Sequence, residues 1–197
     1  MKILFLGDSI TEGAGATKPE NTYVSLVSKK LNAECVNYGI GGTRIARQRN
    51  LWINSVYFNY DFNMRLEIMP KDADLVFCFG GTNDFGHGTA PLGKDNSKDV
   101  YTFKGAVNVL FKNLIKKYGK EKVIIILPLP RYDEEGDKGE FFKAKPAGSE
   151  KLSTYVEYMR KEASKLGLRI LDFRKEFGVP KTNENKGLFF DGLHPND

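Results

Sequence analysis

The chain of 197 residues is 41% hydrophobic, 28% charged and 12% aromatic, a composition that excludes collagen-like, coiled-coil and low-complexity proteins. Its net charge of +5 comes from 30 basic and 25 acidic residues that are interspersed, whereas a nucleic-acid-binding protein usually needs a concentrated basic face. We therefore predict one domain, with a core large enough to hold a functional site, and no nucleic-acid partner.

Five short apolar runs predict β-strands, and periodic segments between them predict helices. The runs carry Ile, Val, Leu and Phe without polar alternation, which is typical of strands covered on both faces. In chain order they are Lys2–Leu6, Glu34–Tyr38, Leu75–Phe79, Val123–Leu127 and Leu168–Leu171. Apolar residues at helical spacing form three stripes, namely Tyr23, Leu26, Val27 and Leu31, then Val100, Phe103, Val107, Leu110 and Leu114, and finally Leu152, Val156, Met159, Ala163 and Leu166.

Strands that alternate with helices predict a parallel sheet with helices on both sides, because parallel strands need crossover connections. Three stretches fit this alternation poorly. Thr43–Pro70 holds a predicted helix at Tyr57–Ile68, Phe85–Asp99 is polar and rich in glycine, and Arg131–Ser149 has the charge of an exposed loop. Long irregular loops in a compact α/β domain are often functional.

No run approaches the ~20 apolar residues of a membrane span, and Met1–Leu6 is too short for a secretory segment, so we expect a cytoplasmic protein. Cys35 and Cys78 each lie in an apolar run and are predicted to be buried thiols rather than a disulfide or a metal pair. A zinc site would need nearly every candidate ligand at once, since His87 and His194 are the only histidines. We predict no metal and no cofactor.

Polar, glycine-rich turns follow the first three predicted strands, at Gly7–Gly13, Asn37–Thr43 and Gly80–Asp84. Ligands of open parallel sheets bind outside the carboxyl ends of the strands, where the strand order reverses. In the order 2-1-3-4-5, strands one and three flank that point. Ser9 and Asn83 would then face each other across it.

The tail adds Asp191–Pro195, which together with Ser9 supplies a nucleophile, a base and a carboxylate. A serine hydroxyl needs a base, normally histidine, that a carboxylate holds in the right tautomer. Asp191, three residues before His194, can reach the same side of a turn and accept its Nδ1 proton. Ser9, His194 and Asp191 therefore satisfy the three roles by residue type.

An attacked carbonyl also needs donors for the negative oxygen that develops on it, and losing one such donor typically costs about 3 kcal/mol in the barrier. The Asn83 side-chain amide and the backbone N–H groups of Gly42 and Ser9 are the candidates. Glycine suits position 42 because no Cβ blocks the approach of a substrate. Alternatively, Ser9 caps a helix or helps to bind a phosphate or flavin, but this gives no role to the Asp–His pair of the tail.

Four sequence blocks resemble those of the SGNH (GDSL-type) hydrolases, in the order of that family and over almost the whole chain. They are Gly7–Ser9, Asn37–Gly42, Gly80–Asp84 and Asp191–Pro195. The resemblance implies a flavodoxin-like three-layer α/β/α sandwich, with a parallel five-stranded sheet of order 2-1-3-4-5. Members of the family usually continue beyond the His-Pro motif into a final helix that packs on the sheet, whereas this sequence stops at Asp197. Either the sequence is truncated or the final helix is absent, and if it is absent we expect an apolar face to be partly uncovered.

The resemblance also implies ester hydrolysis without a metal, with Ser9, Asp191 and His194 as catalytic triad and Ser9, Gly42 and Asn83 as oxyanion hole. Short acyl esters, above all acetyl groups on carbohydrates, are the expected substrates, as small molecules or on saccharides. Two alternatives stay open. One is a lysophospholipase or thioesterase, and the other is a non-catalytic carbohydrate- or nucleotide-binding module on the same fold. The sequence leaves the oligomeric state open.

Other polar residues near these blocks have structural interpretations. His87 is predicted to lie in a loop at the pocket rim and not to act as a base, while Asp84 and Asp8 are predicted to orient their own turns. A basic and aromatic stretch is interpreted as a helix that packs its aromatic face and solvates its charges, although contacts with nucleic acid or a wall of the acyl or sugar pocket are alternatives. It comprises Arg44, Arg47, Arg49, Trp52, Tyr57, Phe58, Tyr60 and Phe62.

Overall fold

A computed structural model describes residues 1–49, 59–132, 134, 150–176, 178–179 and 187–197. At its centre lies a five-stranded sheet whose strands are β1 (Lys2–Gly7), β2 (Glu34–Gly39), β3 (Leu75–Phe79), β4 (Val123–Ile126) and β5 (Arg169–Leu171). The order β2-β1-β3-β4-β5 and the parallel pairing are as predicted, and each strand lies within one residue of its predicted bounds. Leu4 of β1 stands opposite Val36 of β2 and Val76 of β3, which sets the register of the three strands that carry the glycine-rich turns.

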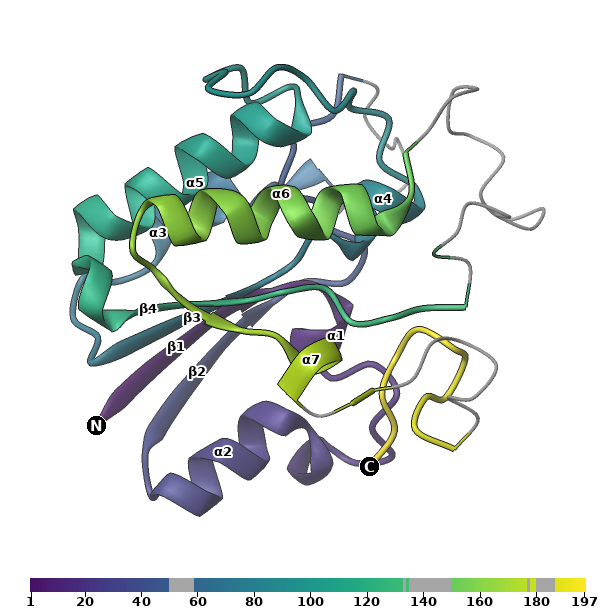
Figure 1. Cartoon of the computed structure of the whole chain (residues 1–197). Coiled ribbons are helices and arrows are strands. Elements are labelled where there is room, and N and C mark those ends of the chain that lie inside the picture. The colour runs from purple at the N-terminus through teal and green to yellow at the C-terminus, as the bar shows by residue number, and fades with distance from the viewer. Residues whose placement is uncertain (50–58, 133, 135–149, 177, 180–186) are drawn as a thin grey trace.

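Helices cover both faces of the sheet. They are α1 (Ser9–Glu12), α2 (Tyr23–Leu31), α3 (Phe62–Ile68), α4 (Thr82–Gly86), α5 (Phe103–Tyr118), α6 (Leu152–Lys165) and α7 (Phe173–Glu176), with 3-10 turns at Pro19–Asn21 and Lys120–Lys122. Figure 1 shows α3, α5 and α6 above the sheet and α2 and α7 below it, which is the expected three-layer arrangement. No described helix has both the length and the apolar character needed to cross a bilayer.

The alternation of side chains along β1 explains why its sequence is apolar throughout. Leu4 and Leu6 pack in the core under α3, α5 and α6, whereas Ile3 and Phe5 point to the opposite face, where Val24 of α2 covers them. All five side chains are buried. Each such burial stabilises the fold by about 1.5–3 kcal/mol, so both layers hold the strand in place.

Two predicted helices begin later than their apolar residues suggest, because polar side chains cap them. The Thr102 side chain accepts a hydrogen bond from the first turn of α5, so Val100 lies before that helix. The Asp61 side chain caps α3 in the same way, and the helix expected from Tyr57 begins only at residue 62. Positions 57 and 58 lie outside the described residues. The predictions of a turn after β3 and of an irregular stretch from Phe85 are wrong in part, because Thr82–Gly86 forms helix α4.

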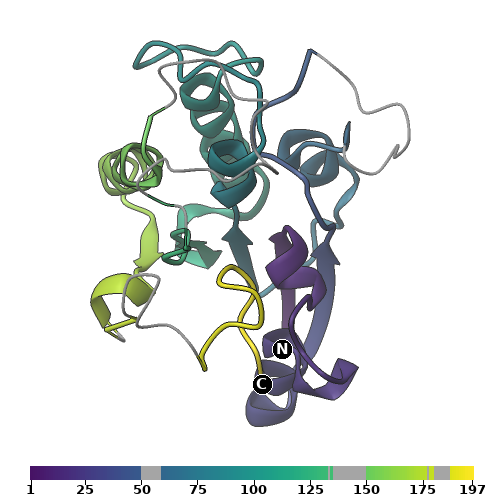
Figure 2. The same ribbon diagram turned by 90° about the vertical axis from the view of Figure 1, so that its right-hand side faces the viewer.

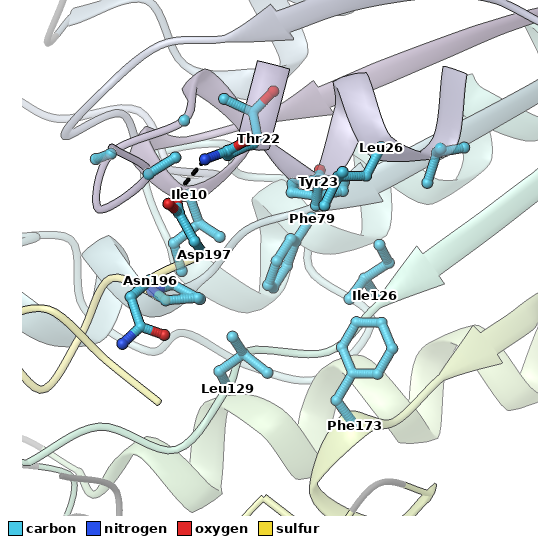
Figure 3. Close-up of a pocket in the computed structure, with 16 residues that line it drawn as sticks. Ile10, Thr22, Tyr23, Leu26, Phe79, Ile126, Leu129, Phe173, Asn196 and Asp197 are labelled. Atoms are coloured by element: carbon cyan, nitrogen blue, oxygen red, sulfur yellow. Dashed lines mark hydrogen bonds between the residues drawn. The ribbon is translucent and has the colours of Figure 1, made fainter. Parts of the chain in front are cut away.

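The predicted apolar face of α2 is wrong in part. Leu26 and Leu31 are 50% and 51% exposed, and Val24, which is not part of the stripe, is the buried residue. Leu26 borders a hollow of about 320 Å³ between α2, α7 and the C-terminal residues (Figure 3). Phe79, Ile126 and other apolar side chains form its floor. This face of the sheet is therefore less completely covered than the opposite one.

The two cysteines lie on strands that β1 separates, as free thiols. Cys78 on β3 is buried as predicted, whereas Cys35 on β2 is partly exposed. Burial raises the pKa of the Cys78 thiol to about 12, so this side chain packs as a neutral apolar group.

Candidate active site

The first turn of the site passes directly from β1 into α1. The Asp8 carboxylate accepts a hydrogen bond from the backbone N–H of Ile10 at 3.1 Å and caps the helix, as predicted for this residue. Ser9 is the first residue of α1, a position whose backbone N–H has no acceptor within the helix. The serine side chain is therefore presented at the carboxyl end of β1, beside an N–H donor.

Ser9, His194 and Asp191, which the sequence predicts as nucleophile, base and carboxylate, lie together. The Ser9 Oγ is 2.8 Å from His194 Nε2, and His194 Nδ1 is 2.7 Å from Asp191 Oδ2. Figure 2 shows the C-terminal segment beside the N-terminal part of the chain, although 185 positions separate the serine from the histidine. A carboxylate only accepts hydrogen bonds, so the Nδ1 carries the imidazole proton and Nε2 is left to accept the serine hydroxyl proton.

The carboxylate of this group is fixed by the turn in which it lies. Its other oxygen, Asp191 Oδ1, accepts the backbone N–H groups of Leu193 at 3.0 Å and His194 at 2.8 Å. Partial burial raises the pKa of Asp191, but the hydrogen bonds from the backbone and imidazole of His194 outweigh it, and the net pKa lies below its ordinary value. Asp191 therefore stays charged and keeps the histidine in one tautomer.

Backbone contacts attach the tail to the rest of the molecule. The Tyr132 N–H donates to the Gly192 carbonyl at 3.1 Å and the Thr17 N–H donates to the Asp197 carboxylate at 2.9 Å, while an antiparallel bridge between Phe189 and Pro195 holds the tail together internally. The backbone of Gly15, with φ of +96°, passes so close that a Cβ there would lie 2.2 Å from the Pro195 carbonyl oxygen and 3.0 Å from the His194 Cβ. A glycine at this position allows the tail to approach α1 and places the imidazole over the serine.

The expected oxyanion donors come from the ends of β1, β2 and β3. After β2, the Gly41 N–H donates to the Glu12 carboxylate at 2.9 Å, and a Cβ on Gly41 would lie 3.6 Å from the Ser9 Cβ. Gly42 follows with φ of +71°, in the left-handed region that glycine readily adopts. The Asn83 amide, in α4 after β3, donates to the Thr43 carbonyl at 3.1 Å. The three predicted donors therefore belong to segments that contact one another.

Arg65 of α3 connects these segments, and the sequence prediction missed it. Its guanidinium donates to the carbonyls of Gly7 at 2.7 Å and Tyr38 at 2.6 Å, and to the Thr43 hydroxyl at 2.8 Å. Burial lowers the pKa of Arg65 to about 10, although the neighbouring Asp8 opposes this shift. The available signal was its spacing, because Arg65 lies three residues after the buried Phe62, on the inner face of the helix.

His87 lies closer to the site than predicted. It follows α4 directly, and its Nε2 is 3.2 Å from the Asn83 Oδ1 while its Nδ1 is 3.0 Å from the Arg44 guanidinium. Asp84 also departs from its prediction, because its carboxylate accepts the distant N–H groups of Ile45 and Ala46 at 2.9 and 2.8 Å rather than orienting a local turn. The four-residue spacing of Asn83 and His87 would have suggested their contact, had the helix been predicted.

The basic and aromatic stretch is largely engaged within the protein. Arg44 and Phe62 are buried, Arg47 forms an ion pair with Asp61 at 2.7 Å, and Arg49 lies over the Tyr101 ring. Its other predicted members are Tyr60, which is 38% exposed, and Trp52, Tyr57 and Phe58, which lie outside the described residues.

The predicted exposed loop at Arg131–Ser149 is mostly outside the described residues as well. Its first residue contradicts the prediction. Arg131 is buried and donates to the backbone carbonyl and the hydroxyl of Thr82, each at 3.1 Å. It therefore supports α4, which carries Asn83.

Comparison with known proteins gives a consistent assignment. The sequence model of the GDSL-like Lipase/Acylhydrolase family matches residues 5–197, whereas no curated protein matches the chain. Among solved structures, an acetyl xylan esterase is 25% identical, with a TM-score of 0.64 over 100% of this chain and 92% of the other. Two further structures resemble the fold. A protein from Lactobacillus plantarum is 24% identical, with a TM-score of 0.76 over 100% of this chain and 88% of the other, and a lipase/acylhydrolase from Enterococcus faecalis is 22% identical, with a TM-score of 0.61 over 100% and 87%.

Proposed function

The chain belongs to the GDSL-like lipase/acylhydrolase family, and on that premise we propose that it is a metal-independent serine esterase that removes short acyl groups, in particular acetyl groups, from carbohydrates. The observation that carries the proposal is the continuous hydrogen-bonded series from the Ser9 hydroxyl through His194 to Asp191. A module that only binds a ligand has no need of such a series.

In the first half of the reaction, the Ser9 Oγ attacks the carbonyl carbon of the ester while His194 Nε2 takes its proton. The negative oxygen of the tetrahedral intermediate accepts hydrogen bonds from the backbone N–H groups of Ser9 and Gly42 and from the Asn83 amide. An amide nitrogen has two protons, so Asn83 can bind the oxyanion while it still donates to the Thr43 carbonyl. These donors supply the charge stabilisation that a metal provides in other hydrolases.

In the second half, the protonated His194 gives its proton to the alcohol oxygen, the C–O bond breaks and the alcohol leaves. Water then attacks the acyl-enzyme, and the same imidazole takes a proton from the water and returns one to Ser9 Oγ. The acid is released and the enzyme is restored. Asp191 stays ionised and stabilises the imidazolium in both halves.

The acetyl xylan esterase among the similar structures supports acetylated carbohydrate as substrate class. We expect acetate release from acetylated xylan and rapid hydrolysis of p-nitrophenyl acetate, with rates that fall as the acyl chain lengthens. A preference for long acyl chains would favour the lysophospholipase alternative instead.

The proposal is tested by comparing wild type with Ser9→Ala, using Ser164→Ala as a control because Ser164 is an exposed residue of α6. Wild type and the control should hydrolyse p-nitrophenyl acetate and bind a fluorophosphonate probe covalently, whereas Ser9→Ala should do neither. Equal hydrolysis by wild type and Ser9→Ala would end the proposal. Absence of both reactions in wild type would favour a binding module.

A further inference from the structure

His87 connects Arg44 to Asn83 through two hydrogen bonds, and the chemistry of the partners fixes which atom donates in each. A guanidinium only donates, so the Arg44 Nη1, 3.0 Å from the His87 Nδ1, requires that nitrogen to be an unprotonated acceptor. The ring is then neutral and carries its proton on Nε2. That N–H, 3.2 Å from the Asn83 side chain, requires the amide to present its oxygen.

The hydrogen bond between the Asn83 amide and the Thr43 carbonyl requires the same orientation of the amide. The Thr43 carbonyl only accepts, so the atom of Asn83 that lies 3.1 Å from it is the nitrogen. Two partners from separate segments, His87 after α4 and Thr43 after β2, thus hold opposite ends of one amide group. The amide cannot rotate by half a turn without losing both hydrogen bonds.

We propose that His87 is a positioning residue for the esterase reaction, which fixes the Asn83 amide with its N–H toward the oxyanion and is itself fixed in the Nε2–H tautomer by Arg44. This inference rests on the proposed function, because it assigns a role through the oxyanion donor. The buried Arg44 lies at the start of the series, so its charge also polarises the Asn83 amide and makes its N–H a stronger donor.

Two substitutions of His87 separate this role from a packing role. The amide nitrogen of His87→Gln occupies the approximate place of Nε2 and can donate to Asn83, whereas His87→Asn mimics only the Nδ1 side and does not reach it. We expect His87→Asn to lower kcat on the order of 10-fold with little change in KM, because a misplaced group reduces transition-state binding more than substrate binding. His87→Gln should recover most of this loss.

A double-mutant cycle identifies the residue through which His87 acts. Asn83→Ala should lower kcat by about 100-fold or more. In that background, His87→Asn should add no further loss. If Asn83→Ala has the kcat of wild type, the oxyanion assignment and this inference both fail. If Asn83→Ala is impaired while His87→Asn is not, or if the two losses multiply, only the inference about His87 fails.

A measurement on the unmodified protein keeps the inference testable if His87→Asn does not fold. Long-range nitrogen–proton NMR correlations distinguish the two neutral tautomers of an imidazole and the imidazolium. The inference requires the Nε2–H tautomer of His87 at neutral pH. An Nδ1–H tautomer or an imidazolium at this residue would overturn it, whatever the activity of the variants.

Discussion

Burial of Asp8 beside the nucleophile should leave a distinct pH dependence in stability. Asp8 is 1% exposed, and burial raises the pKa of its carboxyl group from 3.8 to about 6, although the Ile10 N–H and Arg65 oppose the shift. The folded state therefore binds a proton more tightly than the unfolded state. The stability from this group is complete below the unfolded pKa near 4 and is lost as the pH rises through about 6.

The size of the effect follows from the shift. A difference of about two pKa units corresponds to about 3 kcal/mol, most of it lost between pH 4 and pH 7. Asp8→Asn removes the charge but keeps an oxygen that can cap α1 by accepting the Ile10 N–H. The free energy of unfolding of Asp8→Asn minus that of wild type should therefore rise by ~2–3 kcal/mol between pH 4 and pH 8.

Urea unfolding followed by circular dichroism at intervals from pH 4 to pH 8 measures this difference, and equal m-values would show that both proteins unfold alike. Asp72→Asn provides a control, because hydrogen bonding to Lys2 lowers the pKa of this exposed carboxylate and its difference from wild type should change little between pH 4 and pH 8. A difference between Asp8→Asn and wild type that stays constant with pH, or that falls as pH rises, would refute the reasoning.

Three further substitutions test how the site is held. Gly15→Ala should lower kcat by at least ~10-fold, because its Cβ would displace the tail that carries His194. Gly167→Ala is the control, since Gly167 also has a positive φ but no atom lies within 4 Å of the new Cβ. Equal kcat values for Gly15→Ala and Gly167→Ala would contradict the argument. Asp191→Asn should reduce kcat by ~10²–10⁴-fold through loss of the correct tautomer, with the melting temperature little changed, and a kcat near that of wild type would exclude the carboxylate from the reaction. Arg65→Met should lower the free energy of unfolding in urea by ~2–4 kcal/mol, since it removes the side-chain donor that the Gly7 and Tyr38 carbonyls share, and an unchanged midpoint would show that other groups, such as the Ile40 N–H that also donates to Gly7, satisfy them.

The sheet and its order could be predicted because local sequence is informative there. A strand covered on both faces must be apolar throughout, and only such runs alternate with helical stripes in this chain. The prediction of the buried face of α2 failed, because burial there depends on whether another element packs against the helix. The apolar spacing of Leu26 and Leu31 fits a buried face of α2, but apolar periodicity cannot tell whether another element covers that face.

The candidate site divides in the same way. Ser9, Asp191 and His194 were recognisable because their chemistry requires these residue types, and Asp191 reaches the histidine through a local turn. The contact of His87 with Asn83, four residues before it, was not predicted because the segment was expected to be a turn rather than helix α4. Arg65 was missed because its partners, the carbonyls of Gly7 and Tyr38, lie far away in sequence and could belong to any residue. Long-range hydrogen bonds of this kind have no pattern in a single sequence.

The nucleophile and the base of the candidate site are held by different parts of the molecule. Ser9 lies in a helix that directly follows strand β1 of the central sheet, whereas His194 lies in a short C-terminal segment that is attached through hydrogen bonds to Thr17, Asn21 and Tyr132. Local opening of that segment would disrupt few buried contacts, so it needs far less free energy than global unfolding. Activity can therefore be lost while the sheet stays folded. Mild heating or a low concentration of denaturant should abolish activity before the sheet unfolds.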